Sequence, residues 1–112
     1  MVFEISPGEY LRVSVNWTNT GQERHAFSIL AAYGMEDPET HEWIPKDAVL
    51  VENEVLEPGE TKTTNCDFRE PIHEDLAGLT LDVYVAILDY ENPEEPPYDE
   101  CFDPAAIKVT SS

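Results

Sequence analysis

Positive charge is scarce in this sequence. Only 6 of its 112 residues are Lys or Arg, against 24 Asp and Glu, and the formal net charge is -18 at pH 7. Proteins that bind nucleic acid gain affinity by neutralising phosphates with basic side chains. Nucleic acid is therefore not expected as a partner, and an anionic lipid surface is disfavoured for the same reason.

Long apolar runs are missing as well. No segment approaches the roughly 18 to 20 apolar residues that a transmembrane helix needs. The first residues, Met-Val-Phe-Glu-Ile, lack the basic start and the apolar run of a signal peptide. We expect no membrane insertion and no signal peptide in the chain.

The common motifs of nucleophilic enzymes and of zinc sites are missing. The sequence contains no Gly-x-Ser-x-Gly motif, and neither Cys66 nor Cys101 has neighbours that suggest an activated thiol. The histidines His25, His41 and His73 are isolated, without the paired spacing of a zinc site on a helix. We therefore expect that the protein is not an enzyme.

Apolar residues are plentiful enough for one hydrophobic core. Hydrophobic residues make up 41% of the chain and aromatic residues 10%. A length of 112 residues leaves no room for two independent cores. The sequence therefore predicts a single folded domain over residues 1–112.

Apolar residues alternate with polar ones along most of the chain. Between Tyr10 and Thr18, the apolar Leu11, Val13, Val15 and Trp17 alternate with Arg12, Ser14 and Asn16. This period of two indicates a half-buried strand. Similar patterns predict further strands over 26–33, 41–44, 48–56, 61–68, 79–90 and about 105–110, whereas 72–78 is expected to form a single helical turn.

About seven or eight strands with almost no helix pattern favour an all-β fold, an immunoglobulin-like Greek-key β-sandwich. A jelly roll or a small barrel is compatible with the same periodicity. In the sandwich, Cys66 would lie in the middle of a strand of one sheet and Cys101 at the start of the last strand of the other. The even count of cysteines suits a disulfide, but this separation argues against one.

Two short segments share one pattern, Pro7-Gly8-Glu9 and Pro58-Gly59-Glu60. Proline favours the first central position of a type II turn, and glycine adopts the positive φ that the second position requires. Each segment precedes an alternating stretch. We predict a type II turn before each of these two strands.

The order of these motifs resembles a known family. Pro7-Gly8-Glu9, an alternating strand, Asn19-Thr20-Gly21, a second strand, Leu56-Glu57-Pro58-Gly59-Glu60-Thr61 and Leu76-Ala77-Gly78 follow one another along the chain. In this order the chain resembles the CARDB-like immunoglobulin-type domains of bacterial and archaeal surface proteins. The resemblance implies a non-catalytic spacer, adhesive module or packing unit. The chain departs from it by having Thr80 or Leu81 where related sandwiches often have a tyrosine, and by a long acidic loop.

One sheet is expected to expose an apolar stripe. If Leu81, Val83 and Val85 face the core, the opposite parity of their strand and of its expected neighbour faces outward. The outward residues that form the predicted interface are Leu30, Ala32, Tyr84, Ala86 and Leu88. Exposed apolar patches above a few hundred Å² often mark interaction surfaces. The alternative is that the region 34–56 folds across this sheet and buries the stripe.

The second candidate site is an acidic loop expected over 89–103. Its carboxylates are Asp89, Glu91, Glu94, Glu95, Asp99, Glu100 and Asp103. Several oxygens on a stiff, Pro-rich loop could bind calcium, although the spacing of an EF-hand is absent and a solvated loop is the simpler alternative. With the aromatic Tyr90, Tyr98 and Phe102, the loop could also bind carbohydrate.

Two functional hypotheses follow. The first is a structural or adhesive module that packs against copies of itself or into a larger assembly, either at a cell surface or on a virus particle. The second is a calcium- or carbohydrate-binding module that uses the loop 89–103. The first needs no cofactor, and its partner would be a protein.

Overall fold

The computed structural model describes residues 3–111, and this part of the chain is almost entirely β-structure. The strands are β1 (Phe3–Ile5), β2 (Arg12–Thr18), β3 (His25–Glu36), β4 (Trp43–Leu56), β5 (Thr61–Asp67), β6 (Thr80–Asp89) and β7 (Asp99–Val109). The helical part of the described residues is one 3-10 turn, η1 (Glu74–Leu76), inside the turn predicted over 72–78. No helix in this part of the chain is long and apolar enough to cross a membrane. The expectation of an all-β fold is confirmed.

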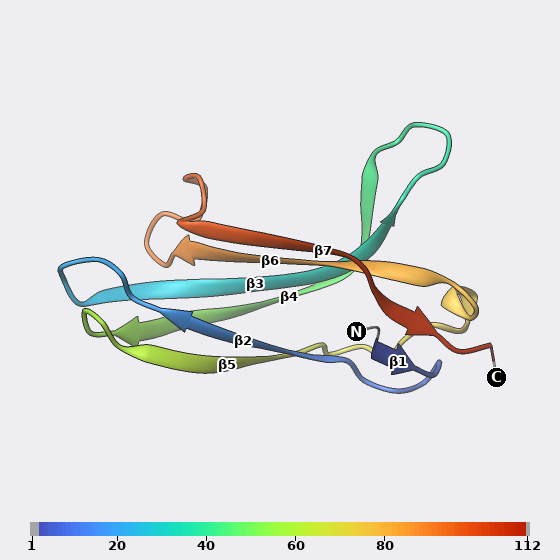
Figure 1. Ribbon diagram of the computed structural model, residues 1–112, viewed down its shortest axis with the longest axis horizontal. Coiled ribbons are helices and arrows are strands. Elements are labelled where there is room, and N and C mark those ends of the chain that lie inside the picture. Colours follow the sequence, from blue (N-terminus) through green and yellow to red (C-terminus); the bar gives the residue numbers. More distant parts are fainter. Residues whose placement is uncertain (1–2, 112) are drawn as a thin grey trace.

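The strands form two layers. The larger sheet has the order β1-β7-β6-β3-β4, and the smaller sheet pairs β2 with β5. β1 runs parallel to β7, whereas the other pairs are antiparallel. Figure 1 shows β2 and β5 lying along one side of the larger sheet, with β1 beside the end of β7. The architecture is therefore β-sandwich-like.

The core lies between the two sheets, on the parity that the alternation predicts. Trp17, Phe27 and Ile29 are buried, and the rings of Trp17 and Phe27 meet edge to face at 5.1 Å between centroids. The indole Nε1 of Trp17 donates a buried hydrogen bond of 2.8 Å to Oγ1 of Thr64. This bond satisfies both polar groups, which would otherwise be costly inside the core.

Both predicted Pro-Gly-Glu turns are present. The backbone N of Glu9 donates to the carbonyl of Ser6 at 3.1 Å, and N of Glu60 donates to the carbonyl of Glu57 at 3.0 Å. The intervening Gly8 and Gly59 have φ of 91° and 79°. These positive angles are those that a type II turn requires at its second central residue.

β7 begins earlier than the sequence indicates. It starts at Asp99, so the connection between β6 and β7 covers only 90–98 and the predicted loop 89–103 is too long. The acidic residues and Pro104 concealed the strand, although proline is tolerated where its nitrogen faces a free sheet edge. An irregular register opposite Leu81–Val83 and a hydrogen bond of 2.8 Å from N of Ala105 to Oδ1 of Asp82 accommodate this stretch.

β3 and β4 form one long hairpin whose closed end bends out of the sheet (Figure 1). The register shifts between Tyr33 and Gly34, which marks a bulge. A Cβ atom on Gly34 would lie 2.2 Å from the carbonyl oxygen of Ile44. Glycine is therefore required for this close approach of the two strands.

Both cysteines are free. Cys66 lies in the core on β5, and burial raises the pKa of its thiol to about 11, with the nearby Asp67 and Glu54 adding to the effect. Cys101 is exposed on β7. The placement of the two thiols agrees with the argument against a disulfide.

Candidate interaction site

The outer face of the larger sheet, turned away from β2 and β5, brings the predicted apolar residues together. The strand registers arrange them in cross-strand rows. One row contains Leu50, Leu30, Ala86 and Glu100, and the next contains Ala48, Ala32, Tyr84 and Phe102. Leu88 lies beside Ser28, on the other side of the row that contains Leu30. All five residues predicted as an interface therefore share one face.

Four further apolar residues on this face were not included in the predicted interface. Ala48 and Leu50 are contributed by β4, and Phe102 by the early part of β7. The ring of Trp43 lies 5.9 Å from that of Phe102 and 6.4 Å from that of Tyr84, between centroids. The parity of β4 could have indicated Ala48 and Leu50, but nothing local in the sequence indicates that Trp43 reaches the other aromatic rings.

The exposed area of the face comes from its large side chains. Ala32 and Ala86 are only 4% and 1% exposed, because their larger neighbours cover them. Leu50 and Phe102 are 39% and 51% exposed. A partner would therefore contact mainly the leucines and aromatic rings, with the alanines as a flat floor between them.

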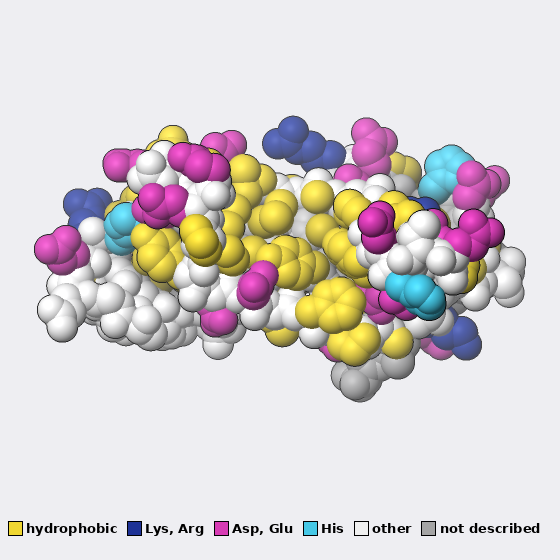
Figure 2. All heavy atoms as spheres, turned by 90° about the horizontal axis from the view of Figure 1, so that it is seen from above, with side chains coloured by type: hydrophobic (Ala, Val, Ile, Leu, Met, Phe, Trp, Pro, Cys, Tyr) yellow, Lys and Arg dark blue, Asp and Glu magenta, His cyan; other side chains and the backbone are white. Residues whose placement is uncertain are grey.

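The region 34–56 does not form a layer over this face, although the ring of its Trp43 packs against Tyr84 and Phe102. It completes β3 and forms β4, which lies beside β3 at the edge of the same sheet. Figure 2, seen from above, shows hydrophobic side chains over the middle of the molecule and carboxylates mainly toward its two ends. The alternative that this region buries the whole stripe is wrong, because the region pairs within the sheet.

Carboxylates on this face hold the aromatic rings in place. The hydroxyl of Tyr84 donates to Oε2 of Glu100 at 2.5 Å, and Nε1 of Trp43 donates to Oδ2 of Asp82 at 3.2 Å. The bond to Glu100, with partial desolvation and the charge of this carboxylate, raises the pKa of Tyr84 to about 12. Both rings are therefore fixed by hydrogen bonds before any partner arrives, which lowers the entropy cost of binding.

The predicted cation-binding residues are spread over three segments. Asp89 ends β6, Asp99, Glu100 and Asp103 belong to β7, and Glu91, Glu94 and Glu95 lie in the connection. Among residues 3–111, no three His, Cys, Asp or Glu side chains gather in a way that could hold a metal ion. Calcium binding therefore stays a prediction, which calorimetry with calcium tests.

Asp89 instead belongs to a small polar cluster at one end of the molecule. Its Oδ1 lies 3.3 Å from Nε2 of His25, and its Oδ2 accepts a hydrogen bond of 3.2 Å from the hydroxyl of Tyr98. Desolvation opposes ionisation of this carboxyl, but hydrogen bonds from N of Glu91 and from Tyr98, together with His25, lower the pKa of Asp89. The cluster ties the start of β3 to both ends of the β6–β7 connection.

Comparison of the chain with family models, with curated proteins and with solved structures gives no match. The resemblance to CARDB-like domains therefore stays a prediction.

Proposed function

We propose that this protein is a non-catalytic interaction module with an immunoglobulin-like Greek-key fold, and that the outer face of its larger sheet packs against a protein surface in a larger assembly. The strand order supports the topology. The chain passes from β2 in the smaller sheet to β3 in the larger, returns from β4 to β5, and crosses again to β6. Such crossings between two sheets are typical of Greek-key sandwiches.

The chemistry of the outer face is the observation that supports the interaction role. The chain has a net charge of -18, yet the row through Tyr84 is apolar or aromatic across four strands, and the row through Leu30 is apolar across three before it ends at Glu100. Surfaces depleted of charge and enriched in aromatic residues are typical of the centres of protein interfaces. The acidic ends seen in Figure 2 would form the polar rim.

The compartment that we propose is extracellular, at a cell surface or on a virus particle. In such a setting an acidic surface keeps neighbouring copies from binding to one another without specificity. The apolar face is then left as the place where specific contact occurs.

The test places a charge on this face. Leu50→Glu and Leu88→Glu should leave the domain folded but reduce its association, measured by sedimentation equilibrium in 0.5 M NaCl and by retention in its native assembly. Burial of apolar area contributes about 25 cal/mol per Å², so a buried charge removes much of the gain. Thr63→Glu, on the exposed face of β5, is the matched control and should change nothing.

A photo-crosslinking amino acid at position 50 or 63 makes the outcome decisive. Position 50 should form protein adducts in the native setting, and position 63 should not. Equal adducts from both positions, or association that survives Leu50→Glu, would show that the outer face is not the interface.

A further inference from the structure

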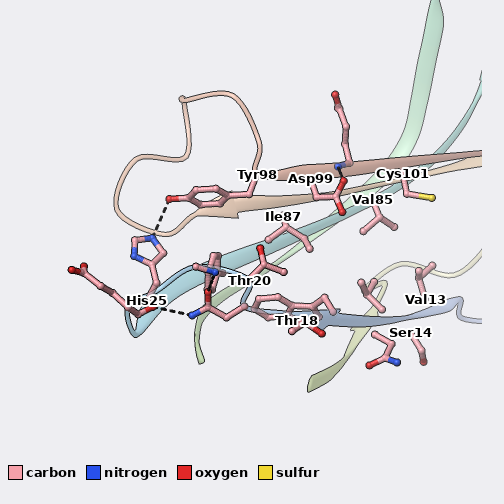
Figure 3. Close-up of a pocket in the computed structure, with 18 of the residues that line it drawn as sticks. Val13, Ser14, Thr18, Thr20, His25, Val85, Ile87, Tyr98, Asp99 and Cys101 are labelled. Atoms are coloured by element: carbon pink, nitrogen blue, oxygen red, sulfur yellow. Dashed lines mark hydrogen bonds between the residues drawn. The ribbon is translucent and has the colours of Figure 1, made fainter. Parts of the chain in front are cut away.

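A second surface lies at the edge of the sandwich, where the core opens to solvent. A cavity of about 1050 Å³ runs between β2 on one side and β6 and β7 on the other. Figure 3 shows Val13 rising from β2 toward Val85 and Ile87 of the opposite sheet, with Cys101 beside them. His25 and Tyr98 stand at one end of this opening. We call it the edge groove.

The groove is open because no strand closes it. In the described part of the chain, β2 pairs only with β5, and β7 pairs with β1 only from Ile107 to Val109. The first half of β7 therefore has a free outer edge that faces the free edge of β2. The core-facing Val13, Val15 and Val85 between them are only half-buried.

The unpaired backbone groups of β2 can be assigned from its register. N of Phe68 donates to the carbonyl of Leu11, and N of Asn19 donates to the carbonyl of Glu60, so the odd-numbered residues of this strand bond to β5. In an antiparallel pair these positions alternate with ones that point away. The N–H and C=O groups of Ser14, Asn16 and Thr18 therefore point toward the free edge.

The negative charge of the groove favours a positively charged partner. Glu23, Asp99 and Glu100 line it, and no Lys or Arg is among its described lining residues. A second copy of this chain would bring a net charge of -18 and would be repelled. A segment with Lys or Arg on its outward side would be attracted, while its inward side needs apolar groups to meet Val15, Val85 and Ile87.

We propose that the edge groove binds an extended segment of another protein, in which apolar residues alternate with Lys or Arg, and that this segment adds as a strand to the free edge of β2. Backbone hydrogen bonds to Ser14, Asn16 and Thr18 hold it in register. Every second side chain enters the core opening, as is usual in strand addition. Glu100, which bonds Tyr84 on the outer face, also borders the groove, and the other residues that line the groove are not among those named for the outer face. The two proposals can therefore be tested separately.

The probe is an acetylated nine-residue peptide of alternating lysine and valine, in 0.3 M NaCl. Cys101 lines the groove and is exposed, whereas Cys66 is buried with the pKa of its thiol raised to about 11, so a thiol reagent reports on Cys101. The peptide should slow the modification of Cys101 at least tenfold at saturation. A peptide of the same composition with its valines and lysines in two blocks controls for attraction to the acidic surface and should not protect.

Hydrogen exchange at the backbone amides of β2, compared with exchange at those of β5, tests whether the peptide binds to the free edge of β2. Hydrogen exchange at Ser14, Asn16 and Thr18 should slow when the peptide binds, while exchange at Thr63 and Asn65 of β5 should not change. Asn16→Pro removes one edge N–H without touching the bonds to β5, and should weaken peptide binding at least tenfold. Leu50→Glu on the outer face should bind the peptide as the unchanged protein does.

Three outcomes overturn the proposal. They are failure of the alternating peptide to protect Cys101 at millimolar concentration, equal protection by the block peptide, and unchanged exchange at Ser14 and Asn16. If Asn16→Pro does not fold, the exchange measurement on the unchanged protein decides alone.

Discussion

At the scale of single residues, aromatic side chains anchor the core. Phe27 is 7% exposed and contacts the rings of Trp17, His25 and Tyr98 with centroids 5.1, 4.9 and 5.5 Å away. Phe27 therefore contacts both the core, through Trp17, and the polar cluster of Asp89, through His25 and Tyr98. The parity of the second alternating run indicated its burial, but nothing in the sequence indicated its contact with Tyr98.

Phe27→Ala should lower the free energy of unfolding by about 3 to 5 kcal/mol, because a large cavity would remain in the core. Denaturation in urea measures the change. Tyr10→Ala is the matched control, since Tyr10 is 65% exposed and a surface change usually costs within about 0.5 kcal/mol. Similar losses for the two variants would contradict the placement of Phe27.

Tyr84 supplies a prediction on pH. The hydrogen bond to Glu100, with desolvation and the charge of that carboxylate, raises its pKa from 10.0 to about 12 in the folded protein. A raised folded-state pKa adds stability that is fully present below the unfolded pKa and is lost as pH rises, here between about 10 and 12. Ultraviolet titration of Tyr84→Phe should lack the transition near pH 12, and Glu100→Gln should move this transition to lower pH. A Tyr84 transition that stays near pH 12 in Glu100→Gln would show that the carboxylate is not its cause.

At the scale of elements, the alternation of apolar and polar residues predicts strands that have one buried and one exposed face. It misses strands whose two faces are equally exposed. β2 and β5 alternate cleanly, and their inward side chains are either buried, as Trp17 and Cys66 are, or half-buried, as Val13 and Val15 are. The early part of β7 carries exposed residues on both faces, because one face lines the edge groove and the other lies on the outer face. Without burial there was no alternation to detect, so this half of the strand was predicted as loop.

The alternation of apolar and polar residues was enough to place the predicted interface residues on one face. The further residues of that face depend on which strands pair and in what register. Leu30 and Tyr84 could be assigned to one face because alternation fixes which side a residue occupies. The neighbours across the sheet are set by which strands pair and in what register, which no single segment encodes. Phe102 and Trp43 therefore joined the face only in the folded structure.

Gly34 makes the bend of the β3–β4 hairpin possible. In Gly34→Ala the new Cβ would lie 2.2 Å from the carbonyl oxygen of Ile44, so the strands must separate. We expect a loss of about 1 to 3 kcal/mol, the usual cost of overpacking, and a change in Trp43 fluorescence as the hairpin moves. Gly21→Ala meets Oδ1 of Asn19 at a longer 3.2 Å and should cost less. An equal cost at both positions would argue against a special role for Gly34.

At the scale of the whole molecule, like charges oppose folding. The described residues extend 47 Å along the longest axis, and the ion pairs of Arg12, Arg24 and Lys62 are at exposed or half-exposed positions, so they contribute little. Repulsion within a net charge of -18 therefore dominates at low salt. Screening should weaken this repulsion more than it weakens the few attractive pairs.

Raising NaCl from about 0.01 M to 0.15 M shortens the Debye length from about 30 Å to about 8 Å. We expect the melting temperature to rise over this range. A gain of about 1 kcal/mol corresponds to about 4 to 8 °C for a domain near this size. Calorimetric scans in NaCl and KCl should agree, since screening depends on ionic strength. A melting temperature that falls with salt would show that attractive pairs dominate.

The parallel pairing of β1 with β7 has a mechanical consequence. Phe3 to Ile5 lie beside Ile107 to Val109 and run in the same direction, so the two ends of the described chain leave the molecule in opposite senses along one ladder. A pulling force on these ends loads the ladder in shear, and its hydrogen bonds resist together instead of opening one by one. N of Thr110 donates to the carbonyl of Ile5, so the backbone polar groups of Ile5 point toward β7. Ile5→Pro, which removes a backbone N–H of this ladder, should lower the rupture force in single-molecule pulling, and an unchanged force would place the resistance elsewhere. A domain with this geometry can carry tension along its length while the outer face remains folded and able to hold its partner.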